Sequence, residues 1–226
     1  MIEAMLHSPF FGMVLCLVTY LLGKWVQNKT KSVLANPLLI AVVICVTLLV
    51  LLDIPYDCFA KGGDVINWML GPVTVLLALG IYNQRTILKQ YFVPVLLGCL
   101  AGSATSIASI LLLCRVCGVD AAVTASIMPK SCTTPIAISI AESHGGVAGI
   151  AAACVMIAGL TGALCAPLFA KWFGITDAVA QGLATGASSH ALGTSKAREM
   201  GEIQGAMSSI AIGVCGLISV LISLFI

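Results

Sequence analysis

Apolar stretches follow one another along almost the whole chain, and short polar segments separate them. A helix needs about 20 consecutive apolar residues to cross the hydrocarbon core of a bilayer. The pattern therefore predicts an all-α integral membrane protein with about eight transmembrane segments. They are expected at residues 9–25, 37–54, 65–82, 91–114, 119–142, 147–172, 178–198 and 205–226. Little of the chain remains for soluble domains, so we interpret 1–226 as a single transmembrane domain.

Composition agrees with this pattern. Hydrophobic residues make up 60% of the chain and charged residues only 9%, whereas soluble domains carry about 25% charged residues. The lipid bilayer is therefore the expected solvent, and a net charge of +2 does not indicate nucleic acid as a partner. The apolar run 9–23 has no basic region before it and no small-residue cleavage site after it. We interpret this run as a retained span rather than a signal peptide.

The ten cysteines are scattered singly, most of them in apolar segments, where a free cysteine behaves as a small hydrophobic residue. Cys114 and Cys117 have C-x-x-C spacing, but no second pair or histidine cluster completes a metal site. We therefore expect no disulfide framework, no metal and no cofactor.

Residues that interrupt helices occur inside several of the predicted spans. Gly71-Pro72 lies in 65–82, Pro129 and Pro135 bracket a polar run in 119–142, and Gly186 and Gly193 lie in 178–198. In a bilayer, helix breaks and polar groups persist only where they are buried in protein or line a cavity. We therefore expect discontinuous helices near a site. Whether 119–142 and 178–198 cross the membrane fully or re-enter is left open.

A short match suggests two pseudo-repeated halves, 1–113 and 114–226. Ala-Leu-Gly at 78–80 followed by Arg85 corresponds to Ala-Leu-Gly at 191–193 followed by Arg198. Chance is the alternative, because these residue types are abundant here. A true repeat would place broken helices at corresponding positions of the two halves, which is typical of a transporter with its site near the bilayer midplane.

Basic residues predict the orientation. The short loops 24–35 and 83–90 both carry Lys and Arg, and with alternating spans they lie on the same side. The positive-inside rule makes that side cytoplasmic and places the N-terminus outside. Lys196 and Arg198, at the end of the seventh segment, agree with this orientation.

The segment from Lys130 to Pro135 is a candidate anion site. It offers an ammonium group, several hydroxyls and a proline placed to begin a new half-helix. The N-terminal amides and dipole of that half-helix favour an anion, and a small carboxylate is the expected ligand. The alternative is that the threonines only satisfy the backbone beside a proline kink. Lys130 favours the anion site, because a kink does not require a charge.

His190 is the histidine in the central part of a predicted span. An ionisable group there is a functional candidate, and imidazole exchanges protons near neutral pH. The alternative is a neutral histidine hydrogen-bonded between helices. Ser189 precedes it, but adjacent helical residues point about 100° apart, so the two would not form a nucleophile–base pair. No carboxylate pair lies in the middle of a span, which favours a proton-coupled or uncoupled mechanism over a sodium site.

These polar motifs resemble those of the LrgB/CidB family of membrane proteins, and the resemblance covers nearly the full length. Residues 130–137 match the family motif K-S-x-T-T-P-I-A, and residues 186–197 match G-x-A-S-H-x-x-G-T-x-x-A. Ser188 stands where an alanine is commoner. The stretches 36–41 and 71–85 are also similar.

The resemblance implies a multi-pass protein of the bacterial inner (plasma) membrane. Bacterial members are named for control of murein hydrolase activity and autolysis, with a small holin-like partner of the LrgA/CidA type. The plastid relative is a glycolate/glycerate translocator, and some bacterial pairs are linked to pyruvate uptake. A homo-oligomer is also plausible from the family.

The leading hypothesis is a secondary transporter of small monocarboxylates of the glycolate, glycerate and pyruvate class. The expected substrate-binding residues are Lys130, Ser131, Thr133, Thr134, Pro135, Ser189, His190, Gly193 and Thr194. His190 is also the expected proton-coupling residue, and Lys130 guides the anion or anchors the segment. The alternative is a holin/antiholin-type regulator of autolysis that acts through an LrgA/CidA-like partner. A serine hydrolase is disfavoured because no G-x-S-x-G elbow is present, so we expect no enzyme.

Overall fold

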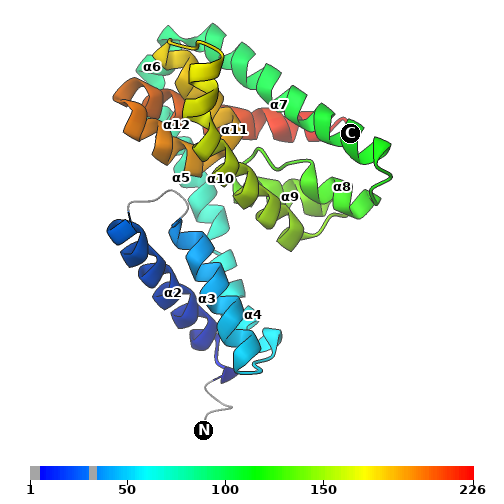
Figure 1. Ribbon diagram of the computed structural model, residues 1–226. Coiled ribbons are helices and arrows are strands. Elements are labelled where there is room, and N and C mark those ends of the chain that lie inside the picture. Colours follow the sequence, from blue (N-terminus) through cyan, green and yellow to red (C-terminus); the bar gives the residue numbers. More distant parts are fainter. Residues whose placement is uncertain (1–5, 31–34) are drawn as a thin grey trace. The chain divides into compact units, whose positions relative to one another are not determined.

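The computed structural model describes residues 6–30 and 35–226, with only the backbone for several residues of α5, Leu70–Asn83 (Figure 1). The described residues form helices joined by short connections and no strands. The chain divides into two compact units, Met1–Val73 and Thr74–Ile226. The first contains α2 (Pro9–Thr30), α3 (Pro37–Leu51) and α4 (Tyr56–Asn67), and α5 crosses the boundary.

The helices of the second unit carry the polar motifs. They are α6 (Arg85–Gln90), α7 (Phe92–Val116), α8 (Ala121–Ile127), α9 (Thr134–Ser143), α10 (Ala148–Trp172), α11 (Ala178–Met200) and α12 (Glu202–Ser223). Among the described residues, four helices are long and apolar enough to span a membrane: α2, α7, α10 and α12. The predicted all-α membrane protein is confirmed, with several of its predicted segments formed by shorter or more polar helices.

The first unit corrects one expectation. The sequence predicts a net acidic loop over 53–64, between the second and third expected segments, but the chain is helical from Tyr56. Pro55 is extended and precedes the helix, Asp57 lies in its first turn, and Cys58 and Gly62 are buried. Gly62 explains the packing: a Cβ atom placed on it would lie 2.6 Å from the Cα atom of Gly12 in α2. Small residues at such a contact let two backbones approach closely.

The interruption predicted within 65–82 is present but displaced. α4 ends at Asn67 and α5 begins at Leu70, so Gly71-Pro72 lies in the first turn of α5 rather than at the break. A proline fits a first helical turn because the amide it lacks would have no partner there. The basic segment 83–90, expected as a loop, is largely the short helix α6. Residues 31–34 of the other basic loop lie outside the described residues.

The two compact units do not test the predicted repeat halves. A contact-based division and an internal repeat are different properties, so the repeat stays a prediction. Ala78 and Gly80, on which the match depends, lie outside the residues whose side chains are described.

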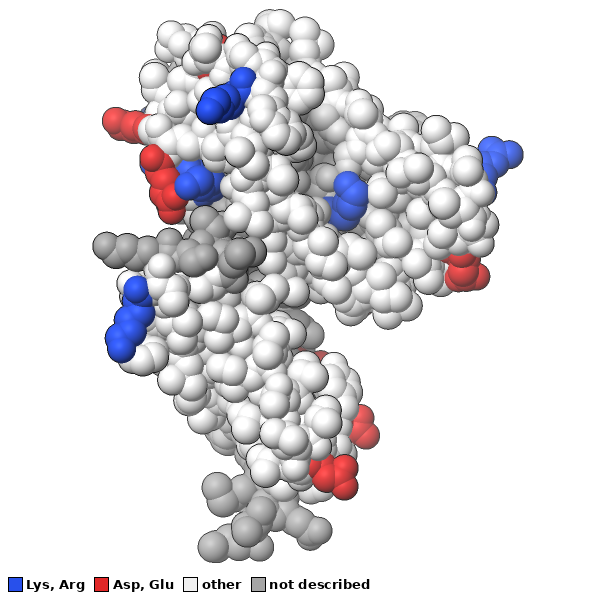
Figure 2. Space-filling model, viewed as in Figure 1, with Lys and Arg blue, Asp and Glu red and all other residues white. Residues whose placement is uncertain are grey.

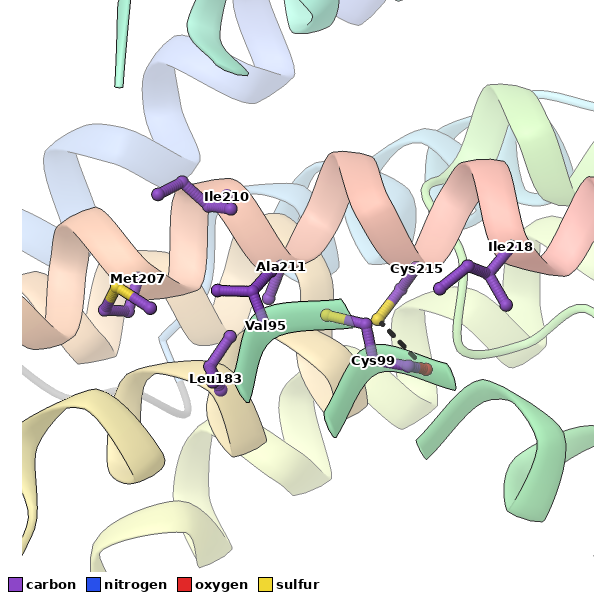
Figure 3. Packing of buried hydrophobic residues seen from close by; sticks show 8 residues of the cluster. All are labelled: Val95, Cys99, Leu183, Met207, Ile210, Ala211, Cys215 and Ile218. Atoms are coloured by element: carbon purple, nitrogen blue, oxygen red, sulfur yellow. Dashed lines mark hydrogen bonds between the residues drawn. The ribbon is translucent and has the colours of Figure 1, made fainter. Parts of the chain in front are cut away.

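The core of the second unit joins three helices (Figure 3). Its buried members are Val95 and Cys99 of α7, Leu183 of α11, and Met207, Ile210, Ala211, Cys215 and Ile218 of α12. The Cys215 thiol points at the Cys99 carbonyl oxygen, 3.9 Å away. α11 packs more extensively against α12 than any other pair of helices among the described residues. This core fixes one side of α11, and α10 packs against another part of the same helix.

Candidate functional site

The segment between α8 and α9 is the predicted proline-bracketed interruption, and the structure confirms it. α8 ends at Ile127 and α9 begins at Thr134, and isolated turns replace helix in between. The Lys130 amide donates to the Ile127 carbonyl at 3.0 Å, and the Cys132 amide donates to the Pro129 carbonyl at 2.9 Å. The break exposes backbone and side chains that a continuous helix would engage.

Thr133 is the residue that precedes α9. Its backbone is extended (φ −66°, ψ 149°), as an N-cap requires, but its side chain makes no capping hydrogen bond. The Oγ1 atom is buried and has no hydrogen-bond partner among the described residues. Pro135 occupies the first turn of α9, as predicted. The start of α9 therefore combines helix-end amides with an unused buried hydroxyl.

Lys130 lies at the centre of a small polar cluster. Its Nζ atom donates to the Ser106 Oγ atom of α7 at 3.5 Å, and the Ser106 and Ser131 hydroxyls are hydrogen-bonded at 2.7 Å. The side chain is only partly exposed. Within residues 6–30 and 35–226, no carboxylate lies within 4.0 Å of this ammonium group. An ammonium group with hydroxyl partners but no counter-ion has a positive charge that no nearby negative charge compensates.

A large cavity adjoins this cluster. Its volume is about 1270 Å³, and it lies between α7, α10, the N-terminal part of α11 and the segment around Lys130. Figure 2 shows a basic side chain in a hollow of an otherwise uncharged part of the surface. Polar residues that line the cavity are Thr105, Ser106, Lys130, Ser131, Thr161, Asp177 and Ser188.

The second interruption lies within α11, at His190 rather than at a glycine. His190 has φ 36° and ψ −128°, a conformation that side chains rarely adopt and that glycine tolerates. The Thr194 hydroxyl donates to the His190 carbonyl at 2.9 Å and lies 2.7 Å from the Ser208 hydroxyl of α12. Because the Thr194 hydroxyl has one hydrogen and donates it to the His190 carbonyl, the Ser208 hydroxyl is the donor to Thr194 in the second bond. These bonds hold the break against α12.

Glycines of α10 make room for the break. A Cβ atom at Gly159 would lie 2.7 Å from the Cε1 atom of His190, and one at Gly162 would lie 2.8 Å from the Ser189 Cβ atom and collide with its hydroxyl. His190 and Ser189 are accordingly buried, at 4% and 0% exposed. The His190 Nε2 atom is buried without a hydrogen-bond partner among the described residues.

The structure brings residues of the two predicted polar motifs to one cavity. Ser188 of the second motif lines it together with residues of the first. Lys130 and Ser131 line the cavity. The other predicted binding residues are not among its lining residues: they are Thr133, Thr134, Pro135, Ser189, His190, Gly193 and Thr194. Ser188, not Ser189, faces the cavity. Whether these residues bind substrate stays a prediction.

Gly193 has a structural explanation. A Cβ atom on it would lie 2.5 Å from the Ser189 Cβ atom and 2.8 Å from the Thr185 carbonyl oxygen. The chain is compressed there by the break at His190, three residues earlier. Gly193 therefore accommodates the break and does not need a ligand to account for it.

The contribution of α7 to the cavity was not predicted from the sequence. Gly98, Gly102 and Ser106 line the cavity, and they are spaced four residues apart. Residues at this spacing share one face of a helix. The Gly/Ser-rich composition of this helix is also typical of plain helix packing. Ser106, the last of these three residues, is the feature that distinguishes a cavity-lining face from plain helix packing.

Comparison with known proteins gives a family. Residues 16–226 match the LrgB-like family. The chain is 41% identical over 182 residues to the uncharacterized protein YxaC of Bacillus subtilis (strain 168), covering 80% of this chain and 79% of that protein. It is 35% identical over 216 residues to the antiholin-like protein LrgB of Bacillus subtilis (strain 168), covering 95% and 94%. The antiholin-like protein LrgB of Bacillus mycoides (strain KBAB4) is 33% identical over the same shares of the two chains. No solved structure matches.

The family match extends over both polar motifs and the helices that position them. The resemblance inferred from residues 130–137 and 186–197 is thereby confirmed. This chain is a multi-pass membrane protein that belongs to the LrgB-like family.

Proposed function

We propose that this protein binds a small monocarboxylate beside Lys130 and carries it across the bacterial plasma membrane. The observation that carries the proposal is the partly buried Lys130 ammonium, which faces a cavity beside the hydroxyls of Ser106 and Ser131. An ammonium away from bulk water is unfavourable unless an opposite charge or hydrogen bonds compensate it. A carboxylate in the cavity would supply that charge.

The neighbouring break strengthens the preference for an anion. The first amides of α9 and the positive end of its dipole lie just beyond Lys130 in the chain. The unused Thr133 hydroxyl is buried at the same helix end. Ser131, Thr133 and Thr134 are therefore proposed to hold the carboxylate during transport.

His190 is proposed as the proton-coupling residue. It is buried, and its Nε2 atom has no partner among the described residues. His190 does not line the cavity in this conformation. Its contact with substrate therefore requires α11 to move, and the non-helical backbone at His190 is where such a movement would be accommodated.

The experiment is uptake of labelled pyruvate and glycolate into liposomes that contain the full chain, with and without an imposed pH gradient. Lys130→Met is expected to reduce the uptake rate by about tenfold or more, because a hydrogen-bonded charge contributes about 1.5–3 kcal/mol. Lys196→Met is the matched control. This lysine pairs with Glu199 at 2.8 Å and does not line the cavity.

Two further variants test the finer assignments. Thr134→Val and His190→Ala are expected to abolish uptake while the protein remains monodisperse in gel filtration. Stimulation by the pH gradient should disappear in His190→Ala. Saturable uptake at the normal rate in Lys130→Met, or in both of these variants, would rule out the assigned roles.

A second candidate function is an antiholin-like role in autolysis. The observation in its favour is the similarity to two relatives, each an antiholin-like protein LrgB that matches this chain over 95% of its length. Such a role would act through a small holin-like membrane protein of the LrgA/CidA type. Co-expression of this chain with such a partner should then delay lysis and keep the partner in a complex that survives purification. Unchanged lysis, together with saturable uptake by this chain alone, would favour the transport function as primary.

A further inference from the structure

The cavity has one polar end and one apolar end. On α7 its lining passes from Pro94 and Gly98 to Thr105 and Ser106 over 12 residues, which is about 18 Å of helix. On α10 it passes from Cys154 to Phe169. The hydroxyls and the ammonium therefore gather at one end, and the other end is lined mostly by hydrocarbon, with Asp177 as its charged residue.

The lining residues of α11 have the same polar and apolar ends as those of α7. A Cβ atom on Gly102 would meet Ala187, and one on Gly98 would meet Leu183, so α11 runs beside α7 with Ser188 toward the polar end. Thr161 lies midway, but its hydroxyl donates to the Ile157 carbonyl of its own helix at 2.8 Å. It therefore adds little unsatisfied polarity to the middle of the cavity.

The cavity is much larger than a short carboxylate. If each heavy atom takes roughly the 30 Å³ of a liquid water, glycolate fills roughly 150 Å³. The cavity volume is about 1270 Å³. Sites for drug-sized ligands have about 300–1,000 Å³. The length of about 18 Å is instead close to half of the roughly 30 Å hydrocarbon core, which is the reach of one acyl tail.

We propose that the cavity takes an amphipathic anion, with a carboxylate head at Lys130 and an unbranched hydrocarbon tail along α7 and α11 toward Phe169. This inference rests on the proposed carboxylate site and extends it from short monocarboxylates to fatty acids. Asp177 fixes the direction of binding. It lies at the apolar end, where its carboxylate is exposed and accepts from the Ala180 amide at 2.8 Å. A second negative charge would be repelled there.

The test is equilibrium binding of labelled butyrate, hexanoate and octanoate to the full chain in nanodiscs of neutral phosphatidylcholine, with empty nanodiscs subtracted. Each added methylene should tighten binding by about two- to fourfold, since a buried methylene contributes about 0.8 kcal/mol. Lys130→Met should weaken octanoate binding by about ten- to hundredfold. Lys196→Met, the matched control at a paired surface lysine, should bind as the unaltered chain does.

A second variant examines the tail. Gly98→Leu places a side chain in the apolar end, and its Cβ atom would meet only the Leu183 Cδ1 atom, at 3.9 Å, so folding should be preserved. Octanoate should lose about tenfold in affinity, the equivalent of about two buried methylenes. Butyrate should lose less.

The outcomes separate this inference from the proposed function. Lys130-dependent binding of butyrate with no gain from a longer tail would overturn the inference and leave the short-carboxylate site standing. A gain with tail length that is equal in Lys130→Met would show partition into apolar surface and would also overturn it. Displacement of octanoate by dilute phosphatidylglycerol would assign the head position to a phosphodiester lipid, against the fatty acid. Absence of any Lys130-dependent carboxylate binding would end both proposals.

Discussion

The two helix interruptions of the second unit are built in opposite ways. Between α8 and α9 the chain leaves the helix altogether over 128–133, and Pro135 restarts it. In α11 the helix bends at one residue, His190, and continues. Each break leaves one buried polar atom without a partner among the described residues, the Thr133 hydroxyl in the first and the His190 Nε2 atom in the second, but only the second is bonded to a neighbouring helix, through Thr194 to α12. The first break is the proposed ligand site, and the second is the proposed point of movement in α11, held in the observed position by the Thr194–Ser208 hydrogen bond.

The glycines of α11 show why this difference was not visible in the sequence. Gly182 and Gly186 resemble helix breakers in an apolar segment, but both are helical and lie against the backbone of α12. These glycines allow close packing of the two helices. A glycine can serve that role as readily as it can interrupt a helix. The break in α11 therefore depends on the packing of this helix against α10 and α12 more than on the residue types within α11.

The largest effect is expected from Gly186→Val, which tests whether the glycines of α11 serve packing. The new Cβ atom would lie 2.8 Å from both the Ala211 Cβ and the Ser208 Cα atoms. Because backbone cannot yield easily, the free energy of unfolding should fall by about 1–3 kcal/mol or more. Thermal unfolding in detergent measures this. Gly102→Ala in α7 is the control, since its Cβ atom has 3.6 Å to Ala187, and it should be neutral or slightly stabilising. An equally mild effect at Gly186 would contradict the packing role.

Thr194→Val tests the bonds that hold the α11 break. The substitution removes the donor to the His190 carbonyl and the acceptor for Ser208, both at buried positions. A buried group left unsatisfied is destabilising, so the unfolding free energy should fall by about 1–3 kcal/mol. The double variant with Ser208→Ala should lose less than the sum of the single variants, as interacting neighbours do. Additive losses would show that the hydroxyls act independently.

His190→Gly and His190→Ala separate the backbone of the break from its side chain. Both remove the imidazole from the space beside Gly159, but only glycine adopts a φ of 36° without strain. The glycine variant should therefore be more stable than the alanine variant by about 1 kcal/mol. Equal stability would mean that the chain regains a regular helix once the imidazole is gone. Uptake should be lost in both, since the proposed proton carrier is absent from each.

Thr133→Val should have the smallest effect on stability and gives the sharpest contrast with Thr194→Val. The Thr133 hydroxyl is buried without a partner, so its replacement by a methyl group of similar size removes an unsatisfied group. The unfolding free energy should stay within about 0.5 kcal/mol or rise. Carboxylate binding should weaken, because the hydroxyl is proposed as a ligand. A large loss of stability would show that Thr133 has a structural hydrogen bond instead.

The sequence predicted the helices and the proline break well, for a physical reason. Apolar length and proline act locally, so 147–172 and the interruption around Lys130 were found close to their observed bounds. The expected loop over 53–64 was wrong, because α4 is stabilised by packing of Gly62 on Gly12 across the sequence. Such a contact between distant segments leaves no local pattern.

The site was predicted in part. Lys130 and Ser131 of the first motif line the cavity, and Ser188 of the second motif lines it too. Ser106 was missed because it lies in a helix whose composition also fits plain packing. The side chains of 189 and 190 were expected to point apart on a regular helix, but the non-helical backbone at His190 lets both bury against α10. A backbone conformation at one residue cannot be deduced from residue types alone.

The fit of α10 to α11 also limits how this protein can be recombined with its relatives. Gly159 and Gly162 leave only the space that His190 and Ser189 fill. A chimera that takes α11 from one relative and α10 from another would inherit half of this fit, and any larger residue at position 162 would meet Ser189. The two helices should therefore be exchanged as one piece. Natural variants that enlarge one side should carry a smaller residue on the other.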